Sequence, residues 1–323
     1  MADKHAFLVA AKRSPIGGFL GGLSKLTAPQ IGAQVAAGLL DETGTDKAAI
    51  DEVYVGEVLQ AGVGQNPARQ VALGAGIPDS ISCTTVNKVC GSGLQCVMFA
   101  DQVIRAGDAN LILAGGIESM SNAPFYVRNH RTGHKFGDAV LVDGMTYDGL
   151  TNIYDEQIMG VLGDYTGQKA GVTREQCDEF ALRSHQRAAA ADKKGAFNAV
   201  RVPIEVPRSE EKFNTDETIR HDLTIDKLTK LRPAFGKDGI LTAGNSSSLS
   251  DGASMVLVAS EAGLKSCGGN AMARIVAQHT AGGPPKELFF APIEAVRKVA
   301  EKAGWGLDKV DLFEINEAFS TQM

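Results

Sequence analysis

The stretch that most constrains this chain is a β-prone run that ends at a cysteine and leads, through two glycines, into a helical pattern. The run covers residues 84–89, the cysteine is Cys90, and the glycines are Gly91 and Gly93. Gly107 is expected to end the helix. The apolar residues at helical spacing, expected on one inward face, are Leu94, Val97, Met98 and Ile104. The sequence therefore predicts a strand-to-helix turn with Cys90 at the start of a buried helix.

This position could activate the Cys90 thiol. Free N–H groups and the helix dipole at a helix start favour the thiolate, which is the nucleophilic form of cysteine. Gly91 and Gly93 would leave room for a substrate to approach the sulfur. From these residues alone, a small buried hydrophobic role for Cys90 stays open.

Composition excludes several classes of protein. The chain has 323 residues, 44% of them hydrophobic, which suits a large buried core. A net charge of −6 argues against a nucleic-acid partner, and no apolar run is long enough to span a membrane. Five scattered cysteines without a CxxC pair argue for a reducing compartment and against a disulfide framework or a metal site. With no leader pattern at the start, a cytoplasmic location is expected, although an organelle signal at a true C-terminus would be invisible here.

Strand-like and helix-like segments alternate, which predicts an α/β fold. A helix over residues 29–40 would turn Ile31, Val35 and Leu39 inward and end near Gly44. A second helix is expected over residues 65–73. The predicted strands cover residues 6–10, 53–55, 84–89, 111–114 and 255–259.

Three segments are expected along the chain. Residues 1–120 and 246–268 would form an N-terminal α/β half, and residues 121–245, with mixed charge and many turn residues, an inserted loop domain. Within that insertion, Thr173 and Gln176 form a capping box that predicts a helix.

The third segment, residues 269–323, repeats the early order and predicts an incomplete second α/β half. Its expected strands cover residues 274–277 and 312–315. Between them, a helix opening at Pro292 would turn Ile293, Val296 and Ala300 inward.

Four motifs, taken together, resemble the thiolases along essentially the whole chain. They are Val86-Asn87-Lys88-Val89-Cys90-Gly91-Ser92-Gly93, Ala114-Gly115-Gly116-Ile117-Glu118-Ser119-Met120-Ser121, Leu241-Thr242-Ala243-Gly244-Asn245-Ser246-Ser247 with Asp251-Gly252-Ala253, and Asn316-Glu317-Ala318-Phe319. The resemblance implies a thiolase fold, with two βαβ-type halves in five layers and an inserted loop domain. It also implies acyl-CoA and coenzyme A as substrates, no further cofactor, and a homodimer or homotetramer.

The resemblance also implies roles for particular residues. Cys90 would carry an acyl group, and Asn316 would stabilise an enolate through a bound water. The substrate-binding residues would be Met159, Arg220, Ala243, Ser247, Ala318 and Phe319. Ile158 stands where the family often has histidine, and this departure leaves open a nucleotide-side contact or the acyl chain-length preference. The family's catalytic histidine and second cysteine would lie beyond Met323, so residues 1–323 are expected to acylate Cys90 slowly and not to turn over.

Several functions stay open at this point. The first is condensation of two acetyl-CoA molecules to acetoacetyl-CoA, or its reversal, which the segment 133–150 favours by its resemblance to the biosynthetic branch. The second is a degradative 3-ketoacyl-CoA thiolase, and the third is a truncated, non-catalytic CoA-binding or interaction protein. A fatty-acid ketosynthase is disfavoured by the Asn316–Phe319 motif and the long insertion.

Overall fold

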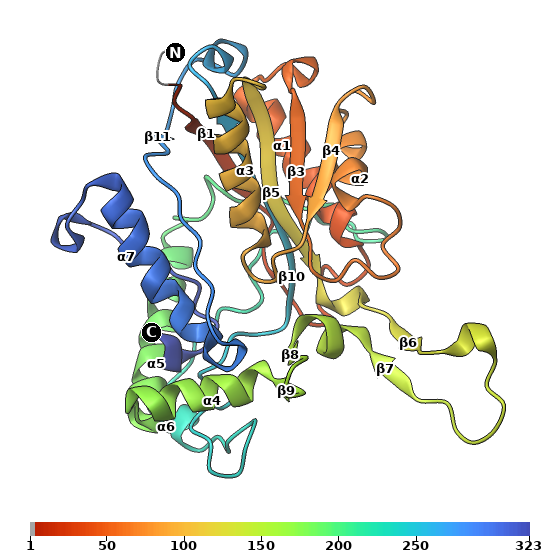
Figure 1. Cartoon of the computed structure of the whole chain (residues 1–323), viewed down its shortest axis with the longest axis vertical. Helices are drawn as coiled ribbons and strands as arrows, with labels where there is room; N and C mark the ends of the chain where they lie inside the picture. The colour runs from red at the N-terminus through yellow and green to blue at the C-terminus, as the bar shows by residue number, and fades with distance from the viewer. Residues whose placement is uncertain (1–3) are drawn as a thin grey trace. The chain divides into compact units, whose positions relative to one another are not determined.

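The computed structural model describes residues 4–323, which form two compact units (Figure 1). The first comprises the described part of Met1–Gly149 together with Asn198–Thr218 and Leu249–Ile275. The second comprises Leu150–Phe197, Ile219–Ser248 and Val276–Met323. The three-segment division expected from the sequence stays a proposal.

A seven-stranded mixed sheet forms the centre of the first unit. Its order is β11-β1-β10-β5-β3-β4, with β2 paired to β10. β3 runs parallel to both β4 and β5, whereas β10 runs antiparallel to β1 and β5. The strands are β1 (Phe7–Arg13), β2 (Gly17–Gly18), β3 (Glu52–Gly56), β4 (Ser82–Val86), β5 (Leu111–Ser119), β10 (Ser250–Ala259) and β11 (Ala273–Arg274).

Helices cover both faces of this sheet (Figure 1). One hydrophobic core packs α1 (Ala28–Thr43) and α2 (Pro67–Gly74) against the sheet, and a second core packs α3 (Ser92–Ala106) against the other face. The predicted inward residues of α1 are fully buried, and Gly44 ends the helix with a positive φ of 63°. The helix expected over residues 29–40 is therefore confirmed.

Short elements complete the first unit. β6 (Phe125–Val127) and β7 (Leu141–Asp143) pair as a hairpin that extends away from the sheet in Figure 1. Single helical turns lie at Lys47–Ala49, Met120–Asn122, His130–Thr132, Met145–Gly149 and Gly263–Ser266.

The second unit is mainly helical. The capping box of Thr173 and Gln176 opens α5 as predicted, because the threonine hydroxyl and the glutamine amide oxygen each accept a backbone N–H of the other residue. Its helices are α4 (Met159–Ala170), α5 (Arg174–Lys193), α6 (Ile225–Thr229) and α7 (Ala291–Ala303). β8 (Thr151–Asn152) pairs with β9 (Gln157–Ile158), and single helical turns lie at Pro285–Phe290, Leu307–Lys309 and Ser320–Gln322.

Three sequence-based expectations about local structure were wrong. The strand expected over 312–315 does not form, and Leu312 is 82% exposed, because no strand of the second unit lies beside it among the described residues. The strand expected over 274–277 is only β11, which pairs with β1. Leu94 and Ile293, expected to face inward, are exposed, because the periodicity of a helix does not say how wide a face its neighbours cover.

No helix within residues 4–323 is long and apolar enough to cross a membrane.

Candidate active site

Cys90 lies on the turn between β4 and α3, where the sequence predicted it. The hydroxyl of Ser92 holds this turn: it donates to the carbonyl oxygen of Val89 at 2.6 Å and accepts the N–H of Lys88 at 2.8 Å. The side chain of Asn87 accepts the N–H of Val89 at 2.9 Å. These bonds fix the residues on both sides of Cys90.

Val89 holds an unusual backbone conformation. Its φ is 49°, in the left-handed region that a β-branched residue rarely adopts. Such a conformation costs about 1–3 kcal/mol and persists only where the surroundings enforce it, often at functional sites. Here the bonds of Asn87 and Ser92 supply that enforcement. The strain marks the Cys90 turn as a specialised segment.

The start of α3 packs closely on the ends of two parallel strands. A Cβ added at Gly56, the last residue of β3, would lie 2.5 Å from the backbone of Ser92. Gly116 of β5 faces Gly93, and a Cβ added at Gly116 would lie 3.2 Å from the Cα of Gly93. The absence of side chains at these positions lets the helix start sit directly against the sheet.

Cys90 is the one exposed residue among the five cysteines, all of which lie in the described residues, although the surrounding protein desolvates its sulfur. Cys83 is half-buried, and Cys96, Cys177 and Cys267 are buried. Desolvation by the surrounding protein raises the pKa of the Cys90 thiol above its ordinary value; its own backbone N–H lowers the pKa and the charge of Glu118 raises it. The sequence pattern predicted that the helix start would favour the Cys90 thiolate. The raised pKa shows that the helix start alone does not do so.

Two carboxyl groups near this turn, one half-buried and one buried, were not singled out from the sequence. The carboxylate of Glu118, in β5, accepts the N–H groups of Val58 and Leu59, both at 3.0 Å. Glu57, the residue after β3, is 1% exposed, and neither of its carboxyl oxygens has a hydrogen-bond partner in the described structure. In the sequence, the signal that could have identified both residues is that each lies at or just after the end of a predicted strand.

Two of the predicted substrate-binding residues meet in the second unit. The guanidinium of Arg220 donates to the carbonyl oxygen of Ala243 at 3.0 Å. The backbone N–H of Arg220 donates to Nδ1 of His185 at 3.2 Å, and burial together with the charge of Arg220 lowers the pKa of that histidine. Arg220 is exposed, so its guanidinium remains accessible to an anionic ligand.

A second group forms around the segment 245–247. The N–H of Ser247 donates to the carbonyl oxygen of Ala318 at 3.0 Å, and Ser246 makes a β-bridge to Phe319. The Phe319 ring packs edge-on against the rings of Phe235 and Phe289. Gly160, which follows Met159 at the start of α4, lies against the Phe235 ring, where an added Cβ would be 2.2 Å away.

Asn316 is exposed, and its carbonyl oxygen accepts the N–H of Ala318 at 3.0 Å. The neighbouring Glu317 accepts the hydroxyl of Ser184 at 2.6 Å. Seven of the eight predicted site residues thus belong to the second unit, and Cys90 belongs to the first.

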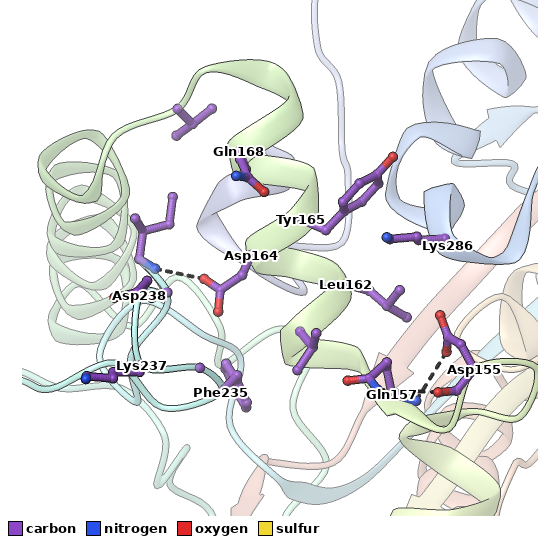
Figure 2. Close-up of a pocket in the computed structure, with 15 residues that line it drawn as sticks. Asp155, Gln157, Leu162, Asp164, Tyr165, Gln168, Phe235, Lys237, Asp238 and Lys286 are labelled. Carbon is purple, nitrogen blue, oxygen red and sulfur yellow. Dashed lines mark hydrogen bonds between the residues drawn. The ribbon is translucent and has the colours of Figure 1, made fainter.

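A pocket of about 840 Å³ lies in the second unit (Figure 2). One wall is α4 and another is the segment 235–240, which Asp164 ties to the helix by accepting the N–H groups of Ile240 and Leu241, both at 2.9 Å. Lys286 lies over the ring of Tyr165, 4.4 Å from its centroid. None of the eight predicted site residues lines this pocket, although Phe235 of its wall contacts Phe319.

Comparisons with known proteins cover nearly the whole chain. Residues 6–262 match the thiolase N-terminal domain, and residues 269–323 match the thiolase C-terminal domain. An acetyl-CoA acetyltransferase of Pseudomonas aeruginosa is 46% identical over 98% of this chain and 81% of its own length. An acetyl-CoA acetyltransferase of Allochromatium vinosum is 47% identical, over 99% of this chain and 82% of that protein.

A solved structure gives the same result for the fold. The crystal structure of human mitochondrial 3-ketoacyl-CoA thiolase is similar with a TM-score of 0.95 and 38% sequence identity, covering 100% of this chain and 82% of that chain. The predicted α/β thiolase fold is therefore confirmed. The motifs around Cys90 and Asn316, both domain matches and these relatives agree that the chain belongs to the thiolase family.

Proposed function

We propose that this chain transfers acetyl groups between thioesters of coenzyme A through an acyl-cysteine at Cys90. The observation that carries the proposal is that Cys90 is the one exposed residue of the five cysteines and lies on a strained, hydrogen-bonded turn at the start of α3. Relatives named acetyl-CoA acetyltransferase support the acetyl group as cargo.

The first half-reaction needs only Cys90 and acetyl-CoA. The Cys90 thiolate attacks the thioester carbonyl carbon, and the tetrahedral oxyanion collapses with loss of the coenzyme A thiolate, which takes up a proton. The backbone N–H of Cys90 is the proposed donor to that oxyanion. The products are an acetyl-cysteine and free coenzyme A.

In the second half-reaction a second acetyl-CoA gives an α-proton to a general base, and this proton balances the one taken up by the coenzyme A thiolate. The α-carbon then attacks the acetyl-cysteine, giving acetoacetyl-CoA and the free Cys90 thiolate. The developing enolate needs a hydrogen-bond donor, and we assign this to the exposed amide of Asn316, acting through a water. The reverse direction cleaves acetoacetyl-CoA with coenzyme A.

The coenzyme A contacts are proposed for the second unit. Arg220 would meet a phosphate group of the nucleotide end, because its guanidinium is exposed while its position is fixed by Ala243. Ser247, Ala243, Ala318, Phe319 and Met159 would line the pantetheine path. The aromatic group of Phe235, Phe289 and Phe319 offers the apolar surface that such a path needs.

We also propose a homodimer or homotetramer located in the cytoplasm. β4 lies at the edge of its sheet, with no further strand beside it within the described residues, and an edge strand favours pairing with another copy. Light scattering measures the assembly directly, and a monomer at micromolar concentration would contradict it.

A substrate series tests the function. The protein is mixed with acetyl-, butanoyl- and octanoyl-CoA, and the rate of acyl loading on Cys90 is followed by mass spectrometry. Fastest loading from acetyl-CoA is expected. Faster loading from octanoyl-CoA would favour a degradative 3-ketoacyl-CoA thiolase; the human structural relative is named a 3-ketoacyl-CoA thiolase. Coenzyme A binding without any loading would favour a non-catalytic binding protein.

A further inference from the structure

Two carboxyl groups, Glu57 and Glu118, lie at the end of the sheet where Cys90 is presented, and the proposed chemistry uses neither. β3 and β5 are parallel neighbours, with Gly56 opposite Gly116. Because parallel strands leave a sheet at the same edge, Glu57 after β3 and Glu118 near the end of β5 emerge together. The start of α3 packs on the same two strand ends.

The environments of the two carboxyl groups differ. Glu118 accepts two backbone N–H groups, from Val58 and Leu59, and such bonds stabilise a negative charge. Glu57 is fully buried, and no donor reaches either of its oxygens in the described structure. A buried carboxylate without donors is strongly disfavoured, whereas a neutral carboxylic acid is tolerated there.

The electrostatics follow from this difference. Desolvation, and then the negative charge of Glu118, raise the pKa of Glu57 to about 8. Burial also raises the pKa of Glu118, but the N–H groups of Leu59 and Val58 oppose that rise. Of the two, Glu57 is therefore the carboxyl group that holds a proton near pH 7.

The other charged groups around this cluster do not change that assignment. On the turn before α3, the Lys88 ammonium donates to the side-chain oxygen of Gln95 at 2.7 Å, and Cys90 senses the charge of Glu118. On β10, Asp251 accepts the hydroxyl of Ser119 and the N–H of Ser121. No cation of the described residues lowers the pKa of Glu57.

We propose that the buried Glu57 and the half-buried Glu118 form a carboxyl pair that stores one proton near Cys90, and that loss of this proton slows the rise of Cys90 reactivity at alkaline pH. Glu118 is the carboxylate and Glu57 the neutral acid. When Glu57 releases its proton to solvent, the pair gains a second negative charge, which disfavours the Cys90 thiolate. Glu57 is a positioning residue that acts through charge, and it touches no substrate.

An infrared titration tests the stored proton. The carbonyl stretch of a neutral carboxylic acid is expected in the wild-type protein at pH 7 and is expected to disappear as the pH passes about 8. Glu57→Gln removes the carboxyl but keeps its shape, so the band should be missing at every pH. Glu261→Gln is the matched control, because it removes an exposed carboxylate of the same unit and should leave the band unchanged.

The pH profile of Cys90 tests the consequence. Rates of Cys90 alkylation by iodoacetamide are measured from pH 6 to pH 10 in wild type, Glu57→Gln and Glu261→Gln. At pH 6 the alkylation rates of wild type and Glu57→Gln should agree, because Glu57 is neutral in the wild type. At pH 9 Glu57→Gln should react about three- to tenfold faster, since one charge within such a cluster shifts a pKa by several tenths of a unit to about one unit.

This inference rests on Cys90 being the nucleophile of the proposed function, but neither readout requires catalysis. Failure of the proposed function would show as a Cys90 that takes no acetyl group while both titrations behave as described. The inference would be overturned if the infrared spectra of wild type and Glu57→Gln showed the same carboxylic acid bands at pH 7. Superimposable alkylation profiles of wild type and Glu57→Gln would overturn it as well. The proposed function would still stand in that case if Cys90 takes an acetyl group from acetyl-CoA.

Discussion

The guanidinium of Arg220 donates a hydrogen bond to the carbonyl oxygen of Ala243, 3.0 Å away, and so joins two residues proposed to contact coenzyme A. The bond fixes one end of an otherwise exposed side chain. A side chain held in this way needs less ordering when it meets an anion.

Arg220→Ala should weaken coenzyme A binding by no more than about tenfold, because an exposed arginine contact with a phosphate is partly screened by solvent. Isothermal titration of coenzyme A into each variant measures the change. Arg187→Ala is the control, because Arg187 is an exposed arginine of α5 in the same unit. Unchanged affinity in Arg220→Ala would remove this residue from the site, and a loss far beyond tenfold would mean that it is buried against the ligand.

Glu57→Gln should change how stability depends on pH. The folded state raises the pKa of Glu57 from 4.5 to about 8, so between these values the folded protein binds more protons than the unfolded one. The free energy of unfolding of the wild type should therefore fall relative to Glu57→Gln as the pH rises through this window, by up to about 1.4 kcal/mol per pH unit. Urea titrations at pH 5, 6.5 and 8 measure the difference, and a constant difference would contradict a neutral Glu57.

Asp164→Ala should destabilise the second unit by about 2 kcal/mol. The variant leaves the N–H groups of Ile240 and Leu241 without the carboxylate that accepts them, and hydrogen bonds to a charged group contribute more than neutral ones. Urea unfolding followed by the signal of Trp305, which also lies in this unit, reports the change. Asp238→Ala, an exposed residue of the same pocket wall, should shift the transition by less than about 0.5 kcal/mol.

Cys90 should be the first of the five thiols to be alkylated when iodoacetamide is substoichiometric. The reason is that Cys90 is the one exposed cysteine residue. Its pKa gives it no advantage, because desolvation raises the pKa of all five thiols, and for Cys96 to about 12. Peptide mapping by mass spectrometry identifies the labelled residue. A first label on Cys83 would contradict the assignment most directly, since Cys83 is the next most accessible thiol.

The sequence predicted those parts of the fold that local chemistry determines. The apolar spacing of Ile31, Val35 and Leu39 needs only one sheet face to pack against, and the structure buries all three. Thr173 with Gln176 marks a helix start by hydrogen bonds within one turn. The turn at Cys90 was predictable because a β-prone run, glycines and a helical pattern follow one another without a break.

Features that depend on distant partners were not predictable in this way. Leu312 stands in a strand-like run, but a strand needs a neighbour, and the described part of the second unit provides none there. The buried Glu57 becomes unusual only because β5 brings the charge of Glu118 beside it. The raised pKa of Cys90 has the same origin, since desolvation and Glu118 come from packing that a motif does not encode.

The central claim is that Cys90 carries the acyl group, and acetylation by acetyl-CoA tests it most directly. The 323-residue chain and Cys90→Ala are incubated with excess acetyl-CoA, quenched in acid and digested, and the acetyl group is located by mass spectrometry. One acetyl group on the Cys90 peptide of the wild type and none in Cys90→Ala is the predicted result. An unmodified Cys90 under saturating acetyl-CoA, or equal acetylation of both proteins, would contradict the account.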